Sequence, residues 1–283
     1  MKIAGNIHRL KIEFDVTPEI RRFVYIYLIE GRHLYLIDTG VDGTEKMIAS
    51  YLKIIGRSIG EIRAVLLTHS HPDHIGAAYR ICTASGCKVY ASAGERNWIE
   101  DIDEQFANRP IPNFYKFVNN NTEVTDVIRG GDILHLEDGI TMRAVNAGGH
   151  SQESLAYHFL EEQVLFTGDA VPAAGDVPIY VNADDSIETL KRLDNITDIR
   201  MYLPAWDEPA DTEEGHLAIK KALELINNIN GTAGSTLIDF PALDPEERFT
   251  IICRKLGMEH EAHNPLFKTS VLSCIMKTNT EIR

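Results

Sequence analysis

Apolar and polar positions divide the first three quarters of the chain into short elements of two kinds. Residues 7–14 alternate between apolar and polar side chains, and 23–29 and 34–37 are apolar runs, so three strands are expected there. Residues 43–55 place apolar side chains at helical spacing and predict a helix. Further strands are expected at 64–67, 88–90, 133–136, 141–145, 154–159, 163–167 and 201–203, and further helices at 73–82, 93–102 and 187–193. Strands mixed with helices in this way predict an α/β fold.

Residues 212–283 differ from the part before them, because their pattern is helical throughout. Apolar residues recur at helical spacing over 213–229, and helices are also expected at 245–256 and 266–276. We therefore expect one domain over 1–211 and a helical C-terminal extension over 212–283.

The stretch 103–122 has two prolines, several aromatic residues and no clear period, so an irregular loop is expected there. Phe106, Phe114 and Tyr115 in this stretch either line an apolar substrate pocket or seal the loop onto the core.

Composition narrows the range of partners. The chain has 283 residues, 44% of them hydrophobic, which is enough to bury a large core. Its net charge of −14 repels phosphate backbones and argues against a nucleic-acid partner. No apolar run approaches the roughly 18 residues that a membrane helix needs, and no signal-like segment opens the chain, so we expect a cytoplasmic protein without membrane contact.

The four cysteines lack a C-x-x-C pair, so free thiols in a reducing compartment are the favoured interpretation. Cys82 and Cys87 are close enough in sequence that a disulfide between them stays open as an alternative.

The densest chemistry lies directly after the apolar run 64–67. His69, His71, Asp73 and His74 fall within six residues, between a predicted buried strand and a predicted helix. Turns at the carboxyl ends of strands are where open α/β folds build their sites. Imidazole and carboxylate ligands together suit zinc, iron or manganese, so a metal site is expected here.

Three more candidate site residues, two aspartates and a histidine, come directly after a predicted strand or a pair of glycines. Asp38 ends the strand 34–37 and Asp169 ends the strand 163–167, where an isolated buried carboxylate would be costly. Asp38 is expected to hold a ligand histidine or a metal-bound water, with a helix cap as the alternative interpretation. His150 follows Gly148 and Gly149, whose backbone freedom allows a side chain to be aimed. The strand histidines are expected to be structural: His8, His33, His135 and His158.

The spacing H-x-H-x-D-H resembles that of the metallo-β-lactamase superfamily, glyoxalase-II-like metallo-hydrolases included. The resemblance covers roughly residues 1–210 and implies a four-layer αββα sandwich with two divalent metal ions, zinc first and iron or manganese as alternatives. It implies that one ion is bound by His69, His71 and His150. It also implies that Asp73 and His74 bind the second ion, that Asp169 bridges the two, and that Asp73 and Asp38 take part in catalysis.

One motif of that family is altered. The resemblance calls for a final Pro-Gly-His histidine after the strand 201–203, but the chain reads Pro204-Ala205-Trp206-Asp207. Asp207 either supplies an oxygen ligand, which would favour manganese or iron at the second site, or is a turn residue beside a weak or empty site. His216 and His263 in the C-terminal extension are further possible substitutes.

Three functions follow from this pattern. The favoured one is a metal-dependent hydrolase that directs a metal-bound hydroxide at a small acyl substrate such as a thioester, lactone or related ester. The second is a mononuclear iron oxidoreductase of the sulfur-dioxygenase kind, which would tolerate a degraded second site. The third is a non-catalytic metal-binding protein.

Overall fold

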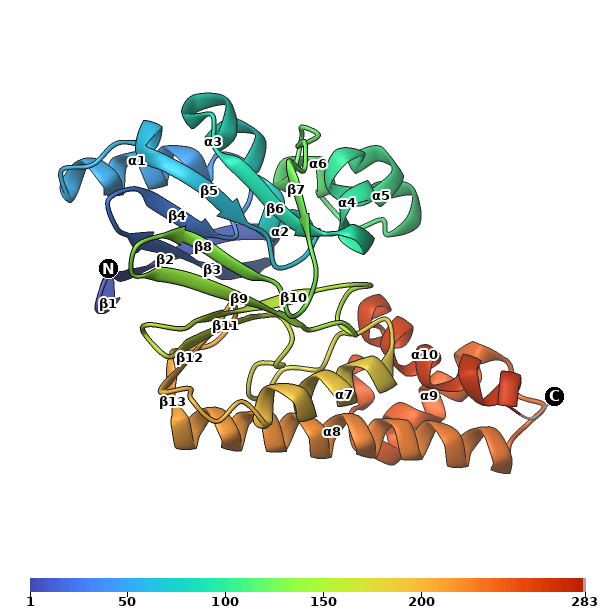
Figure 1. Cartoon of the computed structure of the whole chain (residues 1–283). Helices are drawn as coiled ribbons and strands as arrows, with labels where there is room; N and C mark the ends of the chain where they lie inside the picture. The colour runs from blue at the N-terminus through green and yellow to red at the C-terminus, as the bar shows by residue number, and fades with distance from the viewer. Residues whose placement is uncertain (282–283) are drawn as a thin grey trace.

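Two β-sheets pack face to face, and helices cover the outer face of each, which gives four layers (Figure 1). The computed structural model describes residues 1–281. The expected αββα sandwich with C-terminal helices is confirmed. The boundary at residue 211 stays a prediction, and it coincides with the residue that caps helix α8.

The first sheet has seven strands in chain order, β1 to β7. Its pairs are antiparallel up to β4 and parallel from β4 to β7. The strands are β1 (Lys2–Ala4), β2 (Ile7–Thr17), β3 (Ile20–Glu30), β4 (Leu34–Ile37), β5 (Ile62–Leu66), β6 (Lys88–Ser92) and β7 (Asp126–Ile128). Its helices lie above it in Figure 1: α1 (Thr44–Ile54), α2 (Pro72–Ile75), α3 (Ala78–Ser85), α4 (Ala93–Glu100), α5 (Ile102–Asn108) and α6 (Phe114–Phe117), with a 3₁₀ turn at Ile59–Glu61.

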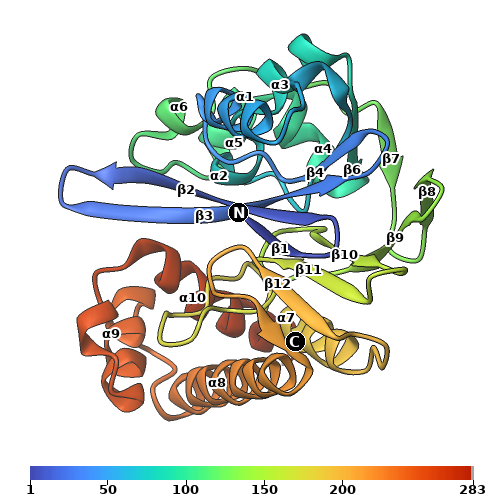
Figure 2. The same ribbon diagram turned by 90° about the vertical axis from the view of Figure 1, so that its left-hand side faces the viewer.

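The second sheet has six strands in the order β13-β12-β11-β10-β9-β8. These are β8 (Ile133–Glu137), β9 (Ile140–Asn146), β10 (Leu155–Phe159), β11 (Val164–Gly168), β12 (Met201–Pro204) and β13 (Ala210–Asp211). The helices on its outer face are α7 (Ala183–Asp194), α8 (Thr212–Asp239), α9 (Pro245–Leu256) and α10 (Pro265–Glu281), with a 3₁₀ turn at Glu259–Glu261. Figure 2 shows these helices gathered on the side of the sandwich opposite α1 to α6.

Alternation along the strands builds three apolar layers from this arrangement. On β3, Val24 and Ile26 point to the helices of the first sheet, whereas Tyr25 and Tyr27 point to the second sheet. A third cluster joins β10 and β11 to α7, α8, α9 and α10. Since α8 and α10 share this core with the sheet, the C-terminal helices form part of the outer layer.

Several predicted elements differ from those in the structure. The stretch 103–122 is irregular only at 109–113 and 118–122. Its first part belongs to α5, which Asp101 caps by accepting hydrogen bonds from the N–H groups of Asp103 and Glu104, and α6 lies in its second half. Helix α8 continues past the predicted end at 229, and the single helix expected at 73–82 is divided into α2 and α3. The short strands β7 and β13 carried no pattern of their own.

The favoured interpretation of four free thiols is wrong for one pair. Cys82 and Cys87 form a disulfide, with their Cα atoms 4.9 Å apart. Helix α3 ends at Gly86 in the left-handed conformation, which returns the chain toward Cys82. Cys253 and Cys274 carry thiols and are buried. Over residues 1–281, no helix is both long and apolar enough to cross a membrane.

Candidate metal centre

The candidate site lies where the carboxyl ends of β4, β5 and β11 meet the loop that joins β9 to β10. The loop after β5 carries the ligand-type residues 69–74, β4 leads to Asp38, and β11 leads to Asp169. Two hydrogen bonds tie the sheets together here: Leu155 N–H donates to Thr68 O at 2.8 Å, and Tyr157 Oη donates to Leu67 O at 2.8 Å. These bonds fix the His150 loop against the loop after β5.

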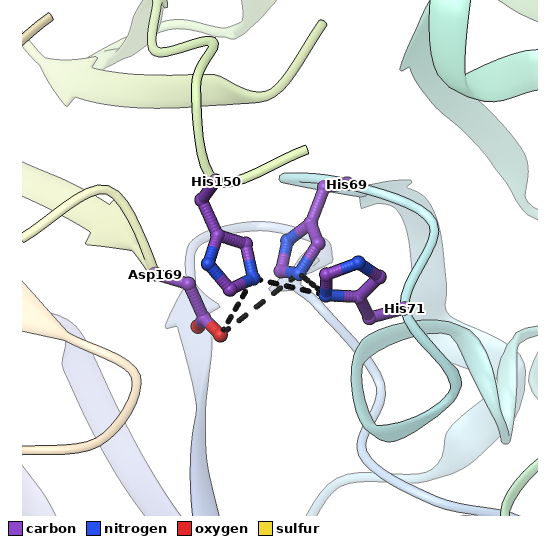
Figure 3. A group of neighbouring side chains, drawn as sticks. All are labelled: His69, His71, His150 and Asp169. Carbon is purple, nitrogen blue, oxygen red and sulfur yellow. Dashed lines mark hydrogen bonds and ion pairs between the residues drawn. The ribbon is translucent and has the colours of Figure 1, made fainter. Parts of the chain in front are cut away.

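Four of the predicted ligands converge on one point (Figure 3). His71 Nδ1 lies 2.9 Å from His69 Nε2 and 2.9 Å from His150 Nε2. Asp169 Oδ2 lies 3.3 Å from His150 Nε2 and 4.0 Å from His69 Nε2. One donor atom from each of the four residues lies within 4.8 Å of the others. This is the atom set that would hold a transition-metal ion.

The hydrogen bonds behind the cluster settle which ring nitrogens carry lone pairs. His150 Nδ1 lies 2.7 Å from the carbonyl oxygen of Ile179, which only accepts, so neutral His150 carries its proton on Nδ1. Thr68 Oγ1 donates to Asp38 and therefore accepts from His69 Nδ1 at 2.9 Å. Both rings thus aim an Nε2 lone pair at the cluster. Lone pairs this close repel one another unless a cation lies between them.

A second group of atoms lies beside the first. His74 Nε2 is 3.2 Å from Asp169 Oδ1 and 3.5 Å from Asp73 Oδ2. His74 Nδ1 is held 2.8 Å from Asp38 Oδ2, so a neutral His74 ring carries its proton on Nδ1 and its lone pair on Nε2. Within residues 1–281, the buried atoms His74 Nε2 and Asp169 Oδ1 make no hydrogen bond. Buried polar atoms without partners are costly, and a second divalent cation between them would remove that cost.

The electrostatics of the two groups differ. Burial holds the pKa values of His69 and His71 well below their ordinary value, so both rings are neutral. Burial also raises the pKa of Asp73. For His74 burial acts in the lowering direction, but Asp169, Asp73 and Asp38 together raise its pKa well above the ordinary value. The negative charge around His74 Nε2 therefore favours a positive charge at this position, which a second divalent cation would supply.

Comparison with models of protein families identifies the family to which this chain belongs. The model of the metallo-beta-lactamase superfamily matches residues 20–246, which is most of the chain and includes both groups of ligands. The chain belongs to the metallo-beta-lactamase superfamily. The resemblance of its H-x-H-x-D-H spacing is thereby confirmed.

Relatives of known name lie within this superfamily. A hydroxyacylglutathione hydrolase of Hyphomonas neptunium is 30% identical over 51% of this chain, and the match spans 48% of that protein, about half its length. A hydroxyacylglutathione hydrolase of Methylococcus capsulatus is 25% identical over 80% of this chain and 83% of its own. A crystal structure of a metallo-beta-lactamase family protein from Thermus thermophilus superposes with a TM-score of 0.74 at 18% identity, covering 98% and 94% of the two chains. The last shows the shared fold alone.

Asp38 stands behind the second group of this superfamily site. Its Oδ1 accepts from Thr68 N–H and its Oδ2 from Thr68 Oγ1, both at 2.8 Å, in addition to the contact with His74. Its backbone is left-handed, with φ of 59°, which is uncommon outside glycine and costs about 1–3 kcal/mol. In this conformation one carboxylate reaches both Thr68, in the loop after β5, and His74. Asp38 thus positions a ligand histidine, as one of the two interpretations of the sequence expected.

The structure separates Asp207 from the metal cluster. Its carboxylate accepts from Glu208 N–H at 2.8 Å and from Ala174 N–H at 3.3 Å, which are contacts of a turn residue. Trp206 occupies the space instead, where its Nε1–H donates to Asp169 Oδ2 at 3.0 Å. The contacts therefore favour the turn interpretation of Asp207. Of the extension histidines, His216 pairs with Asp194 at 2.6 Å, and neither it nor His263 belongs to the cluster found in residues 1–281.

Sequence reasoning missed a buried carboxylate that joins the two metal loops. Glu95, in the first turn of α4, accepts from Ser70 N–H at 3.0 Å and from Glu153 N–H at 2.8 Å, and it also accepts from the hydroxyls of Ser70 and Ser151. Ser70 lies between His69 and His71, and Ser151 follows His150. The only signal in the sequence was a serine next to a histidine in each of the two loops, since each serine hydroxyl needs a hydrogen-bond acceptor and Glu95 serves both.

The aromatic residues of 103–122 are divided between surface and core. Phe114 is buried in the first cluster, Phe106 packs against that cluster, and Tyr115 is exposed. Their rings contact one another, with centroids 5.1–5.3 Å apart. These contacts favour the sealing role over the substrate pocket.

Proposed function

We propose that this protein is a metal-dependent hydrolase of small acyl substrates, with thioesters as the first class to test. The observation that carries the proposal is the pair of adjacent donor groups, three histidine nitrogens with Asp169 Oδ2, and His74 with Asp73 and Asp169 Oδ1. The names of the relatives, hydroxyacylglutathione hydrolases, favour a thioester over other acyl compounds. The net charge of −14 favours a small-molecule substrate over a nucleic acid.

Different residues of the chain would bind the two cations, orient a ligand and exchange protons. His69, His71 and His150 would hold one cation, Asp73 and His74 the second, and Asp169 both. Two bound divalent cations, zinc first, lower the pKa of a water toward neutrality and polarise the attacked carbonyl. Asp38 keeps His74 in the tautomer that binds metal. Asp73 is the most exposed of the second group, at 18% of its side chain, so it is placed to exchange a proton with substrate or solvent.

The hydrolase is favoured over the mononuclear iron oxidoreductase by the partnerless atoms at the second position. An enzyme that used one iron would have no need of the unpaired His74 Nε2 and Asp169 Oδ1. A cytoplasmic location is part of this proposal and rests on the sequence alone.

Removal of metal provides the test. Dialysis against a chelator is expected to reduce thioester hydrolysis by about 10³-fold or more, because bound cations supply several kcal/mol of transition-state stabilisation. Zinc, manganese and iron(II) are then added back separately, with and without oxygen, and hydrolysis of a hydroxyacylglutathione, a lactone and a phosphodiester is followed. Recovery of acyl hydrolysis without oxygen supports the proposal. Turnover that appears only with iron and oxygen would replace it by the oxidoreductase.

A further inference from the structure

Helix α5 is attached directly to the loop that carries the ligand histidines. Gln105 is fully buried, and its Nε2 donates to Ser70 O at 2.7 Å, at the residue between His69 and His71. Arg109 follows one helical turn later and caps the helix, and its N–H donates to Gln105 O at 2.8 Å. Residues four apart share one helix face, so Arg109 lies on the face that meets the metal loop.

The Arg109 side chain is directed inward. It is half-buried, although its neighbours Asn108 and Pro110 are exposed. Burial lowers the pKa of Arg109, and the negative charges of Asp73, Asp169 and Glu95 act in the opposite direction, so its guanidinium lies within the field of these carboxylates. The same positive charge acts on the three histidines of the first group. Arg109 thus places a positive charge beside the candidate metal centre.

The backbone of Arg109 is anchored, but the donors of its guanidinium are not used. It makes no hydrogen bond with any residue in the described range 1–281, although an arginine offers five N–H donors. The far end of its segment is fixed as well, because Asn113 Nδ2 donates to Val16 O at 2.7 Å and the next residue, Phe114, is buried. Because the backbone is fixed at both ends, a ligand that binds the guanidinium would have to order only the side chain and not the segment.

Charge balance indicates what that ligand is. Asp38, Asp73, Asp169 and Glu95 are the carboxylates of the site, and two divalent cations would balance their formal charge. Before a hydroxide or a substrate is bound, Arg109 would then be the excess positive charge of this site, in a chain of net charge −14. Planar guanidinium matches the two oxygens of a carboxylate, which it binds with paired hydrogen bonds.

We propose that Arg109 binds a carboxylate of the substrate and so selects acyl compounds that carry one. This inference rests on the proposed hydrolase function and adds the anionic substrate class to it. The carboxylate lies either on the acyl part or on the thiol part of the substrate, and matched substrates separate the two.

The test compares four thioesters with wild type, Arg109→Gln and Arg109→Lys. Two substrates carry a carboxylate, one on the acyl part and one on the thiol part, and each has a neutral amide counterpart. Wild type is expected to prefer one of the charged members by about 10- to 100-fold in kcat/KM, the range for a hydrogen bond to a charged group. Arg109→Gln should abolish this preference, because kcat/KM falls more for the charged members than for their neutral counterparts, and Arg109→Lys should restore part of it.

Two controls keep the outcome unambiguous. Arg96→Gln removes an exposed arginine of α4 that pairs with Glu100, and the preference should survive there. Metal content of each variant is measured, and the carboxylate product is titrated into the metal-loaded protein by calorimetry. An unchanged charge preference in Arg109→Gln, or an equal loss on charged and neutral substrates, would overturn the role of Arg109. If wild type hydrolyses none of the four, the hydrolase proposal fails, and equal product binding by wild type and Arg109→Gln would then overturn the Arg109 proposal separately.

Discussion

Asp169→Asn is expected to lose one metal ion per chain and about 10³-fold in acyl hydrolysis. Asp169 is the residue that both ligand groups share: Oδ2 lies 3.3 Å from His150 Nε2, and Oδ1 lies 3.2 Å from His74 Nε2. The amide of asparagine keeps one oxygen but carries no charge, so it cannot neutralise and join two cations. The magnitude follows from the several kcal/mol that paired cations contribute to the transition state.

Trp206→Phe is the matched control, because it removes the other partner of the same carboxylate. The indole N–H donates to Asp169 Oδ2 at 3.0 Å, and the ring packs near Phe14 and Phe23. Phenylalanine keeps the packing and leaves the charge of Asp169 intact, so both metals and most of the activity should remain. Metal analysis and steady-state kinetics measure both variants. If Trp206→Phe loses a metal as Asp169→Asn does, the indole is part of the metal site and the assignment of Asp169 alone as the bridge is wrong.

Asp38→Asn is expected to weaken the second metal site by about 10- to 100-fold or more and to leave the first site nearly unchanged. Asn accepts the left-handed backbone that Asp38 adopts, so the fold should tolerate it. The Asp38 carboxylate accepts from Thr68 N–H, Thr68 Oγ1 and His74 Nδ1. An amide must present its NH₂ to at least one of these donors. His74 would then lose the acceptor that keeps its proton on Nδ1 and its lone pair on Nε2, and partners of this kind are worth about 10- to 100-fold in metal affinity.

Competition with a chromophoric chelator measures the two affinities, and histidine nitrogen NMR measures the His74 tautomer. Asp42→Asn, a surface change four residues later that removes only contacts to Arg80 and Asn119, is the control. Because Asp38 contributes to the raised pKa of His74, that pKa should fall in Asp38→Asn and stay the same in Asp42→Asn. Equal weakening of both metal sites would mean that Asp38 supports the whole loop rather than His74.

Much of the site could be predicted because its ligands lie on local signals. His69, His71, Asp73 and His74 follow one apolar run, and Asp38 and Asp169 each end another. The resemblance to the metallo-β-lactamase superfamily implied that these side chains come together at the ends of strands from both sheets. His150 was predicted from its match to the third histidine of the family and from the two glycines before it. Gly149 has φ of 120°, with the backbone of Ser186 in the space that a Cβ would need.

The residues that the sequence did not reveal act across the fold. Glu95 and Arg109 reach the site only because α4 and α5 pack against the loop after β5, and neither has a neighbour in sequence that indicates this. The sequence left two roles open for Asp207, metal ligand or turn residue, because its position just after a strand does not determine where its side chain points. There, the N–H groups of Ala174 and Glu208 hold its carboxylate, and the indole of Trp206 takes the contact with Asp169. The Cys82–Cys87 disulfide depended on the left-handed turn at Gly86, which spacing alone left undecided.

Metal content per chain tests the dinuclear site most directly. Wild type and Asp207→Ala are purified without added metal, and divalent ions are counted by elemental analysis together with protein concentration. We predict two ions per chain in both proteins, because Asp207 holds a turn and Asp73, His74 and Asp169 complete the second site. One ion per chain in wild type, or two in wild type and one in Asp207→Ala, would contradict this account of the metal centre.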